Sequence, residues 1–367
     1  MPHLFSEFRL RDLTIPNRIG VSPMCQYSCD DGFANDWHFA HLAARAVGGA
    51  GLVFTEAAAV MPEGRIAPQD LGVWSEKHFE PLERIARFVD AQGAIAGIQL
   101  AHAGRKASTY RPWSGKGAVP KAEGGWTPLA PSAIRFAEDY PQPEAMSLAD
   151  VAAAQNAFAL AAERAYAAGF RVIEIHAAHG YLAHEFLSPL SNQRTDAYGG
   201  SFDNRIRFVC ETVARVRKAL PDRCPLFVRV SATDWTEGGW DIEQTVELAR
   251  RLKDLGVDVV DSSSGGNVER AAIPVGPGYQ VPFAARIRRE AGIATAAVGM
   301  ITEPAQADQI VRNGEADMVL LARELLREPY WPLRAASELG QSASWPAQYL
   351  RAGPHGATER TPAHEID

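Results

Sequence analysis

The stretch SLADVAAAQNAFALAAERAYAAGFRVIEIH, residues 147–176, contains one complete helix-to-strand unit. Ser147, with Asp150 three residues later, resembles a capping box, and Gly169 stands where a helix favours a left-handed end. The run RVIEIH that follows is short and rich in β-branched residues, which is typical of a strand buried on both faces. The pattern predicts a helix that leads through a glycine into a buried strand.

The same unit recurs along the chain. A helical pattern starts at Asp241 with Gln244 three residues later, and another starts at Thr302 with Pro304 in its first turn. Further glycines stand at predicted helix ends, at positions 93, 256, 292 and 314. Eight apolar runs are predicted to be strands: 18–22, 51–57, 94–100, 171–176, 225–230, 257–262, 294–299 and 316–321.

Eight strand–helix repeats predict an α/β protein with a parallel (β/α)8 TIM barrel. The main alternative, a doubly wound open sheet, usually has a glycine-rich fingerprint after its first strand, whereas SPMCQYS follows here at 22–28. We expect residues 4–16 to form a hairpin that caps the closed end of the barrel. Residues 101–146 form a long insertion after the third strand, and such connections are more often functional than idle. No linker is evident, so we expect a single domain over 1–367.

The composition, 46% hydrophobic and 22% charged, is typical of a soluble globular protein. The net charge is −7 and acidic and basic residues are interspersed, so we expect no nucleic-acid partner. The most apolar long stretch, 151–170, contains Gln155, Glu163 and Arg164 and cannot span a bilayer. The charged N-terminus does not resemble a signal peptide, so we expect a cytoplasmic protein with free thiols at Cys25, Cys29, Cys210 and Cys224.

In a (β/α)8 barrel the active site lies at the C-terminal ends of the strands. Gly299 and Arg323 follow strands seven and eight, where barrels commonly bind phosphate. His176, His179 and Tyr181 follow strand four. One side of the barrel mouth is therefore predicted to hold a phosphate, and the other side offers imidazoles and a phenol.

The segment EIHAAHGYLAHEFL at 174–187 allows two interpretations. His176 and His179 could bind a metal, as in a metal-dependent barrel hydrolase, with His102, Asp234 or Glu56 as a third ligand. They could also hold a carbonyl oxygen with their N–H groups, and we favour this because Gly180 and Tyr181 follow directly. His184 lies where a helix begins and is interpreted as a structural residue or one at the rim of the site.

Structural interpretations exist for other candidate residues too. Tyr181 could be a packing tyrosine, and Cys25 an inert core thiol. Arg229 and Arg323 could each pair with a neighbouring acid. Lys106 could be a solvated charge on the insertion.

Six segments resemble the Old Yellow Enzyme family of FMN-dependent ene-reductases, in particular its thermophilic-like subgroup with xenobiotic reductases and NADPH dehydrogenases. The resemblance extends over nearly the whole chain, and the fourth segment is the most specific. It implies FMN as bound cofactor, NADPH or NADH as reductant, and small activated alkenes as substrates. The segments are NRIGVSPMCQYS (17–28), DWHFAHLAARAVGGAGLVFTEA (36–57), GIQLAHAGRKAS (97–108), IEIHAAHGYLAHEFLSPLSNQRTDAYGGSFDNRIRF (173–208), RVSATDW (229–235) and PAQYLRAG (346–353).

The resemblance also implies roles for individual residues. His176 and His179 are expected to bind the carbonyl oxygen of the substrate, and Tyr181 to donate the proton. Tyr27 and Lys106 are expected to line the substrate side. Arg351 resembles an arginine that enters a neighbouring subunit's site, which implies a dimer or tetramer. The residues expected to contact the cofactor are Ser22, Pro23, Met24, Cys25, Ala57, Gln99, Arg229, Gly299, Ala322 and Arg323.

The chain departs from the family pattern at one of these positions. The family usually has a glycine before the phosphate-binding arginine, and this chain has Ala322 before Arg323. The extra methyl group raises the question of whether the backbone can still approach a phosphate.

Overall fold

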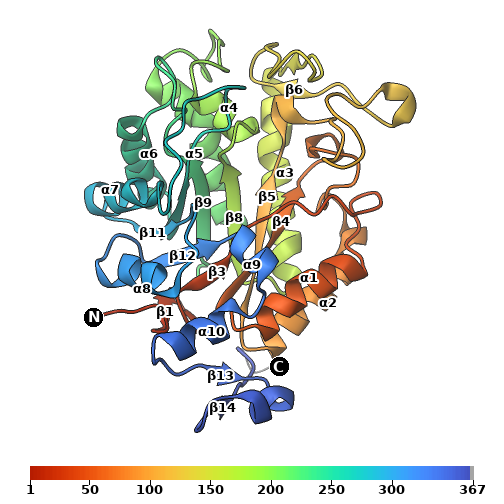
Figure 1. Cartoon of the computed structure of the whole chain (residues 1–367). Coiled ribbons are helices and arrows are strands. Elements are labelled where there is room, and N and C mark those ends of the chain that lie inside the picture. Colours follow the sequence, from red (N-terminus) through yellow and green to blue (C-terminus); the bar gives the residue numbers. More distant parts are fainter. Residues whose placement is uncertain (364–367) are drawn as a thin grey trace.

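The structure is a computed structural model that describes residues 1–363, so the last four residues of the expected domain, 364–367, lie outside the described residues. Eight parallel strands close into a barrel surrounded by helices (Figure 1). This confirms the predicted TIM barrel, and every barrel strand falls within or overlaps a predicted run. The strands are β3 (Ile19–Val21), β4 (Leu52–Ala59), β5 (Ile95–Ala101), β8 (Val172–Ala177), β9 (Leu226–Ser231), β10 (Val259–Ser263), β11 (Ala294–Ala297) and β12 (Met318–Leu321).

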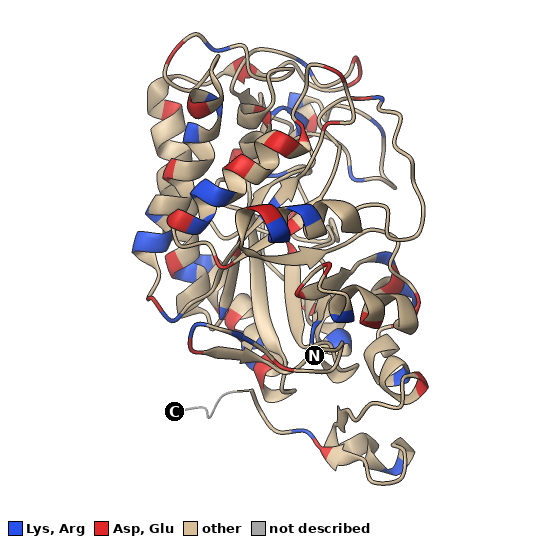
Figure 2. Ribbon diagram, turned by 90° about the vertical axis from the view of Figure 1, so that its left-hand side faces the viewer, with Lys and Arg blue, Asp and Glu red and all other residues tan. Residues whose placement is uncertain are grey.

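The helices cover the outside of this barrel and bury their apolar faces against it. Figure 2 shows acidic and basic residues interspersed along these helices. No helix within residues 1–363 is long and apolar enough to cross a membrane. The helices are α1 (Asp36–Val47), α2 (Phe79–Ala91), α3 (Leu148–Ala167), α4 (Leu182–Leu187), α5 (Phe202–Ala219), α6 (Ile242–Asp254), α7 (Val281–Ala291), α8 (Pro304–Arg312), α9 (Arg323–Arg327) and α10 (Trp331–Glu338).

The helix boundaries largely follow the local signals in the sequence. The Ser147–Asp150 capping box is formed at the start of α3, and the Asp241 side chain accepts a hydrogen bond from the Gln244 N–H at the start of α6. All five predicted helix-end glycines have positive φ, from 63° at Gly292 to 98° at Gly169. The prediction for α8 was slightly wrong. The helix begins at Pro304 and not at Thr302, because proline occupies the first helical turn and Glu303 is the N-cap.

The interior of the barrel is apolar at its closed end. The predicted hairpin is present as β1 (Phe8–Leu10) and β2 (Leu13–Ile15), which pair antiparallel. Its apolar side chains join the inward-facing residues of the strands in one buried cluster, so the hairpin closes the barrel as expected. The cluster includes Phe8, Leu10, Leu13, Ile15, Leu52, Phe54, Ile95, Val172, Phe227, Val259, Met318 and Leu320.

Two segments lie outside the barrel proper. The insertion after β5 contains the 3-10 turns η3 (Gly104–Lys106) and η4 (Lys121–Glu123) and a small sheet of β6 (Leu129–Ala130) and β7 (Glu144–Ala145). It lies at the end of the barrel where the strands finish, beside α4 (Figure 1). The C-terminal segment contains β13 (Ser344–Trp345), η5 (Ala347–Ala352) and β14 (Thr358–Glu359), at the opposite end.

The closed end of the barrel predicts a large cost for removing a buried side chain. Leu52 is fully buried there, whereas Leu160 on α3 is 48% exposed. We expect Leu52→Ala to lower the free energy of unfolding by about 2–5 kcal/mol, because it removes apolar contacts and leaves a cavity. The matched change Leu160→Ala should alter it by less than about 0.5 kcal/mol. Denaturant titration measures both, and equal losses would contradict the assigned core.

Candidate active site

The turn between β8 and α4 brings three of the predicted residues together at the open end of the barrel. His176 lies on β8, and His179 and Tyr181 lie in the turn that follows. The ring centres of His176 and His179 are 5.1 Å apart, and those of His176 and Tyr181 are 5.0 Å apart, with the rings nearly perpendicular in both pairs. His179 has a φ of 60°, so the turn holds a non-glycine residue in a left-handed conformation. Such local strain is often found at functional sites.

Both histidines are neutral in this setting. Burial lowers the pKa of His176 and of His179 well below the ordinary value, and Arg229 and Lys106 lower both further. His176 Nδ1 accepts a hydrogen bond from the Ala178 N–H at 3.2 Å. Its proton therefore resides on Nε2, and His176 presents an N–H donor. His179 Nε2 lies 2.7 Å from the Ser263 hydroxyl oxygen.

Tyr181 keeps its proton as well. Burial raises the pKa of its hydroxyl well above the ordinary value, and Cys25, Tyr27 and Asp70 raise it further. Burial likewise raises the pKa of the Cys25 thiol, so the segment after β3 presents a thiol and not a thiolate. Tyr181 lines a small cavity together with Ala57 and Asp70. Tyr27 and Tyr181 thus lie close enough for the charge of one to affect the pKa of the other.

The Lys106 side chain is bound to the backbone of the site. Its ammonium donates to the carbonyl oxygen of His179 at 2.7 Å and to that of Gly266. It also lies 5.5 Å from the centre of the Tyr181 ring. Desolvation lowers the pKa of Lys106 to about 7, with Arg105 adding to the effect. Lys106 therefore ties the insertion to the turn that contains the histidines.

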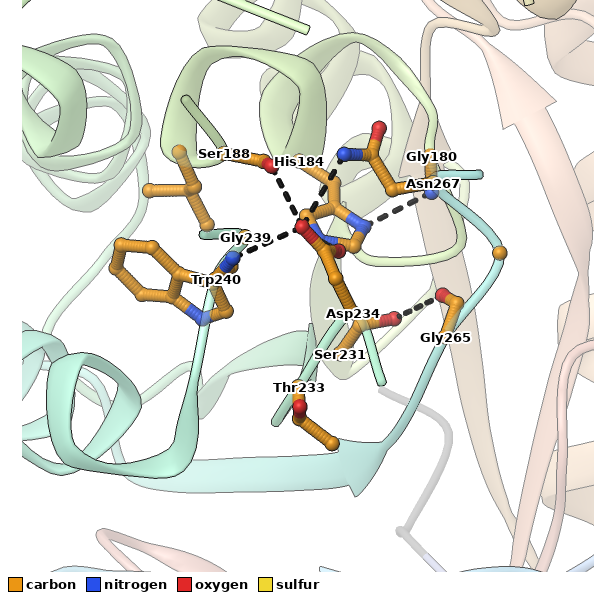
Figure 3. A network of polar contacts seen from close by, with 12 residues as sticks. Gly180, His184, Ser188, Ser231, Thr233, Asp234, Gly239, Trp240, Gly265 and Asn267 are labelled. Carbon is orange, nitrogen blue, oxygen red and sulfur yellow. Dashed lines mark hydrogen bonds and ion pairs between the residues drawn. The ribbon is translucent and has the colours of Figure 1, made fainter. Parts of the chain in front are cut away.

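A buried network that the sequence did not predict holds this turn from behind (Figure 3). His184 Nδ1 accepts from the Gly180 N–H at 2.9 Å, and its Nε2 lies 2.9 Å from Asp234 Oδ1. The other Asp234 oxygen accepts from the Ser188 hydroxyl at 2.5 Å and from the Trp240 N–H at 2.9 Å. His184 and Asp234 are fully buried, so His184 is structural, as expected. The only signal for Asp234 was its place in RVSATDW, just after β9.

Glycine is required where two loops meet in this network. Gly180 has a φ of 71°, and a Cβ on it would lie 2.2 Å from the Gly266 carbonyl oxygen. Gly266 has a φ of 90°, and a Cβ there would lie 2.7 Å from the His179 Cα. The loop after β10 therefore packs backbone to backbone against the histidine turn.

The other cofactor-side candidates lie on or directly after six strands, β3, β4, β5, β9, β11 and β12. Arg229 Nη2 donates to the Ser22 hydroxyl at 2.7 Å, and Gln99 Nε2 donates to Glu174 Oε1 at 2.7 Å. Gly299 has a φ of 120°, and a Cβ on it would lie 2.7 Å from the Gln280 amide nitrogen. Pro23, Met24 and Cys25 are partly exposed, Ala57 is buried, and Arg323 is exposed at the start of α9.

Arg351 is not brought to this site. It lies in η5 and is exposed. Its segment is attached to the closed end of the barrel by Arg360, which donates to carbonyl oxygens of Ala46 and Gln92 at the ends of α1 and α2. Within one chain, Arg351 therefore lies at the end of the barrel away from His176.

A family model decides the assignment. The model for the NADH:flavin oxidoreductase / NADH oxidase family matches residues 3–342. The chain belongs to this family. An NADPH dehydrogenase from Geobacillus sp. (strain WCH70) is 51% identical over 95% of this chain and 98% of the relative. The chain is an oxidoreductase of small-molecule substrates that uses FMN with NADH or NADPH.

Solved structures of two other reductases share the fold. Morphinone reductase superposes with a TM-score of 0.76 at 25% identity, over 93% of this chain and 91% of that one. A 2-naphthoyl-CoA reductase complex superposes with a TM-score of 0.84 at 25% identity, over 92% of this chain. The chain spans about half of that protein, since 52% of it is covered.

The donor set of this flavin oxidoreductase fits FMN. Gly299 carries no Cβ and has a φ of 120°, a conformation that side chains rarely adopt, while Gln99 and Arg229 supply an amide and a cation. Ala322 has a φ of −103°, so no left-handed conformation demands a glycine at this position. The metal-hydrolase interpretation is not supported. Within residues 1–363 no three His, Cys, Asp or Glu side chains are grouped to hold a metal ion.

The Asp234 network predicts a defined acid sensitivity. Hydrogen bonds and His184 lower the pKa of Asp234 from 3.8 to about 2 despite its burial. The ionised carboxylate therefore stabilises the fold above pH 4 by about 2 kcal/mol, and this contribution is lost as the pH falls through about 2. We expect Asp234→Asn to lower the free energy of unfolding at pH 7 and to flatten its dependence between pH 4 and pH 2. Urea titrations across this range measure both effects.

The control for this prediction is Asp254→Asn, because Asp254 is exposed at the end of α6. It should leave both the stability and its acid dependence within about 0.5 kcal/mol of the parent chain. If Asp234→Asn behaves like Asp254→Asn, the network does not hold the turn.

Proposed function

We propose that this flavin oxidoreductase is an ene-reductase that reduces activated C=C bonds of enones and related electrophiles. The observation that supports it is the grouping of two neutral imidazoles and a protonated phenol around the end of β8. Reduction of an activated alkene leaves an enolate-like charge on the carbonyl oxygen. Neutral N–H donors stabilise such a charge where it develops, and a nearby O–H can protonate the carbon next to the carbonyl.

His176 and His179 hold the carbonyl oxygen of the substrate in this proposal. Nε2 of His176 is its N–H donor, because Nδ1 already accepts from the Ala178 N–H. The Ser263 hydroxyl lies against His179 Nε2 and orients that ring. Lys106 fixes the His179 carbonyl, so the insertion holds the donor in place.

Tyr181 donates the proton to the carbon next to the carbonyl. Its raised pKa keeps the proton on the phenol at neutral pH. Tyr27 lines the same side, with its ring against Trp113 at 6.0 Å. Bound FMN supplies the hydride, and the protein contributes binding, orientation and charge stabilisation.

The other residues at the strand ends bind the cofactor in this proposal. Ser22, Pro23, Met24 and Cys25 contact the flavin ring from the segment after β3, and Ala57 does so from β4. Gln99 and Arg229 bind its pyrimidine edge. The residues that hold the phosphate are Gly299, Ala322 and Arg323.

The reductant, the location and the oligomeric state are proposed as well. The family relative named NADPH dehydrogenase favours NADPH as reductant. We propose a cytoplasmic protein that folds as one domain over 1–367 and forms a homodimer or homotetramer. Arg351 lies far from its own site, so its expected role requires a neighbouring subunit.

An anaerobic titration tests the proposal. NADPH should bleach the flavin spectrum of the purified protein, and a cyclic enone should restore it with one alkene reduced per flavin. Maleimides and nitro compounds extend the panel. A flavin that NADPH reduces but no activated alkene reoxidises would contradict the ene-reductase assignment.

Removing either imidazole should weaken binding of carbonyl and phenolic ligands. We expect His176→Ala and His179→Ala to raise the dissociation constant of a phenolic ligand about 10- to 100-fold, because each removes a donor to a charged oxygen. FMN should remain bound. Difference spectra of the flavin measure ligand affinity. His355→Ala is the control, because His355 is exposed in the C-terminal segment. Loss of FMN with unchanged ligand affinity would contradict the assignment.

Removing the phenolic hydroxyl should separate the two half-reactions. We expect Tyr181→Phe to slow reoxidation by an enone about 100-fold or more, since proton donation contributes this order of rate enhancement. Reduction by NADPH should remain within about twofold, because it needs no proton from Tyr181. Stopped-flow absorbance measures both rates. Tyr166→Phe at the closed end is the matched control, and equal slowing of both half-reactions would exclude a proton-donor role.

A further inference from the structure

A polar layer lies inside the barrel between the apolar cluster and the histidine turn. Side chains alternate along a strand, so Glu174 shares the inward face of β8 with Val172 below it and His176 above it. Arg229 on β9 and Asp261 on β10 occupy the same layer, because they are register partners. Glu174, Arg229, Asp261 and Gln99 are each at most 3% exposed.

These four side chains form one chain of contacts. Gln99 Nε2 donates to Glu174 Oε1 at 2.7 Å, and the Glu174 carboxyl group lies next to that of Asp261. Asp261 Oδ2 lies 2.6 Å from Arg229 Nε, and Arg229 Nη2 donates to Ser22 at 2.7 Å. The chain thus links the two groups assigned to the pyrimidine edge of the flavin, Gln99 and Arg229.

The charges in this layer do not balance unless one proton is added. It holds two carboxyl groups and one guanidinium, away from water. Two neighbouring carboxylates in a dry site cannot both ionise. Glu174 Oε2 and Asp261 Oδ1 accept no hydrogen bond from another group of the described residues, and one proton between the two carboxyl groups would satisfy both oxygens. Asp261 forms the ion pair with Arg229, whereas Glu174 accepts only from a neutral amide. The proton therefore belongs on Glu174.

Burial raises the pKa of both carboxyl groups, and the ion pair with Arg229 lowers that of Asp261, which agrees with a proton on Glu174. Burial raises the pKa of Glu174 well above the ordinary value, and the charge of Asp261 raises it further. The other titratable groups that face the layer are Arg229 and the neutral His176. Arg229 is already counted in the charge balance and His176 carries no charge, so neither group compensates a second carboxylate.

We propose that Glu174 is a neutral carboxylic acid that donates its proton to Asp261 and thereby sets the charge and orientation of the groups facing the flavin. The inference rests on the proposed FMN-dependent function. With Nε2 of Gln99 committed to Glu174, its oxygen Oε1 is left to accept from an N–H of the cofactor. With Asp261 paired to Arg229, the positive charge beside the flavin is largely compensated. Glu174 and Asp261 are positioning residues, and the flavin potential reports their state.

Two isosteric changes distinguish the carboxyl groups. Glu174→Gln keeps an acceptor for Gln99 and a donor for Asp261, so it imitates the neutral acid. We expect the midpoint potential of its flavin to remain within error of the parent protein. Asp261→Asn leaves the Arg229 charge uncompensated, which favours the negatively charged reduced flavin. We expect the equilibrium to shift about tenfold or more toward reduced flavin, which is about 30 mV for two electrons.

The potentials are measured anaerobically against reference dyes, with the parent protein alongside. Equal upward shifts in Glu174→Gln and Asp261→Asn would show that both groups are ionised and overturn the proposal. An unchanged potential in Asp261→Asn would also overturn it, because Asp261 would then not compensate Arg229.

Unfolding without cofactor tests the proton independently. We expect the denaturant midpoint of Glu174→Gln apoprotein to match that of the parent apoprotein, while Glu174→Ala unfolds at lower denaturant because Gln99 and Asp261 lose their partner. Equal losses in both variants would overturn the neutral-acid assignment even if Asp261→Asn does not fold. Failure of the parent chain to bind FMN would refute the proposed function and leave this comparison unaffected.

Discussion

Closure of eight parallel strands is the constraint on which the rest of the structure depends. A closed parallel barrel has no free edges, and all strand ends of one polarity meet in one ring. The hairpin β1–β2 and the apolar cluster fill the other end, so the polar residues can collect only at the open end. The site is thus a consequence of closure, since it brings together side chains as far apart in the chain as Ser22 and Arg229, which are separated by 207 residues.

Two sets of buried polar contacts hold the site in place. From below, the layer of Gln99, Glu174, Arg229 and Asp261 stands between the apolar core and the flavin side. From behind, the His184–Asp234 pair and the close approach of Gly180 to Gly266 hold the turn with the histidines. Both supports are buried and polar, and such networks are stable only when nearly every group has a partner. The imidazoles of this turn are therefore held rigidly.

Local signals predicted most of the fold. Ser147 and Asp150 capped α3, and glycines at helix ends adopted positive φ, because these effects depend on a few adjacent residues. The start of α8 was misplaced by two residues, since Thr302 resembled a cap while Pro304 set the helix start. Contacts between distant strands were not predictable from spacing. The bond from Lys106 to the His179 carbonyl joins residues 73 apart in the chain, and the Asp234–His184 pair joins the loop after β9 to α4.

The sequence by itself determined the barrel, the family and the residue types at the strand ends, because these depend on periodicity, caps and motifs that are local in the chain. Only the tertiary structure decided how those residues act on one another. It buried His176 and Tyr181, so the imidazole is neutral and the phenol keeps its proton. It also placed Glu174 and Asp261 beside Arg229. It also placed Arg351 at the far end of the barrel. Protonation and reach depend on desolvation and distance, which are properties of the folded chain.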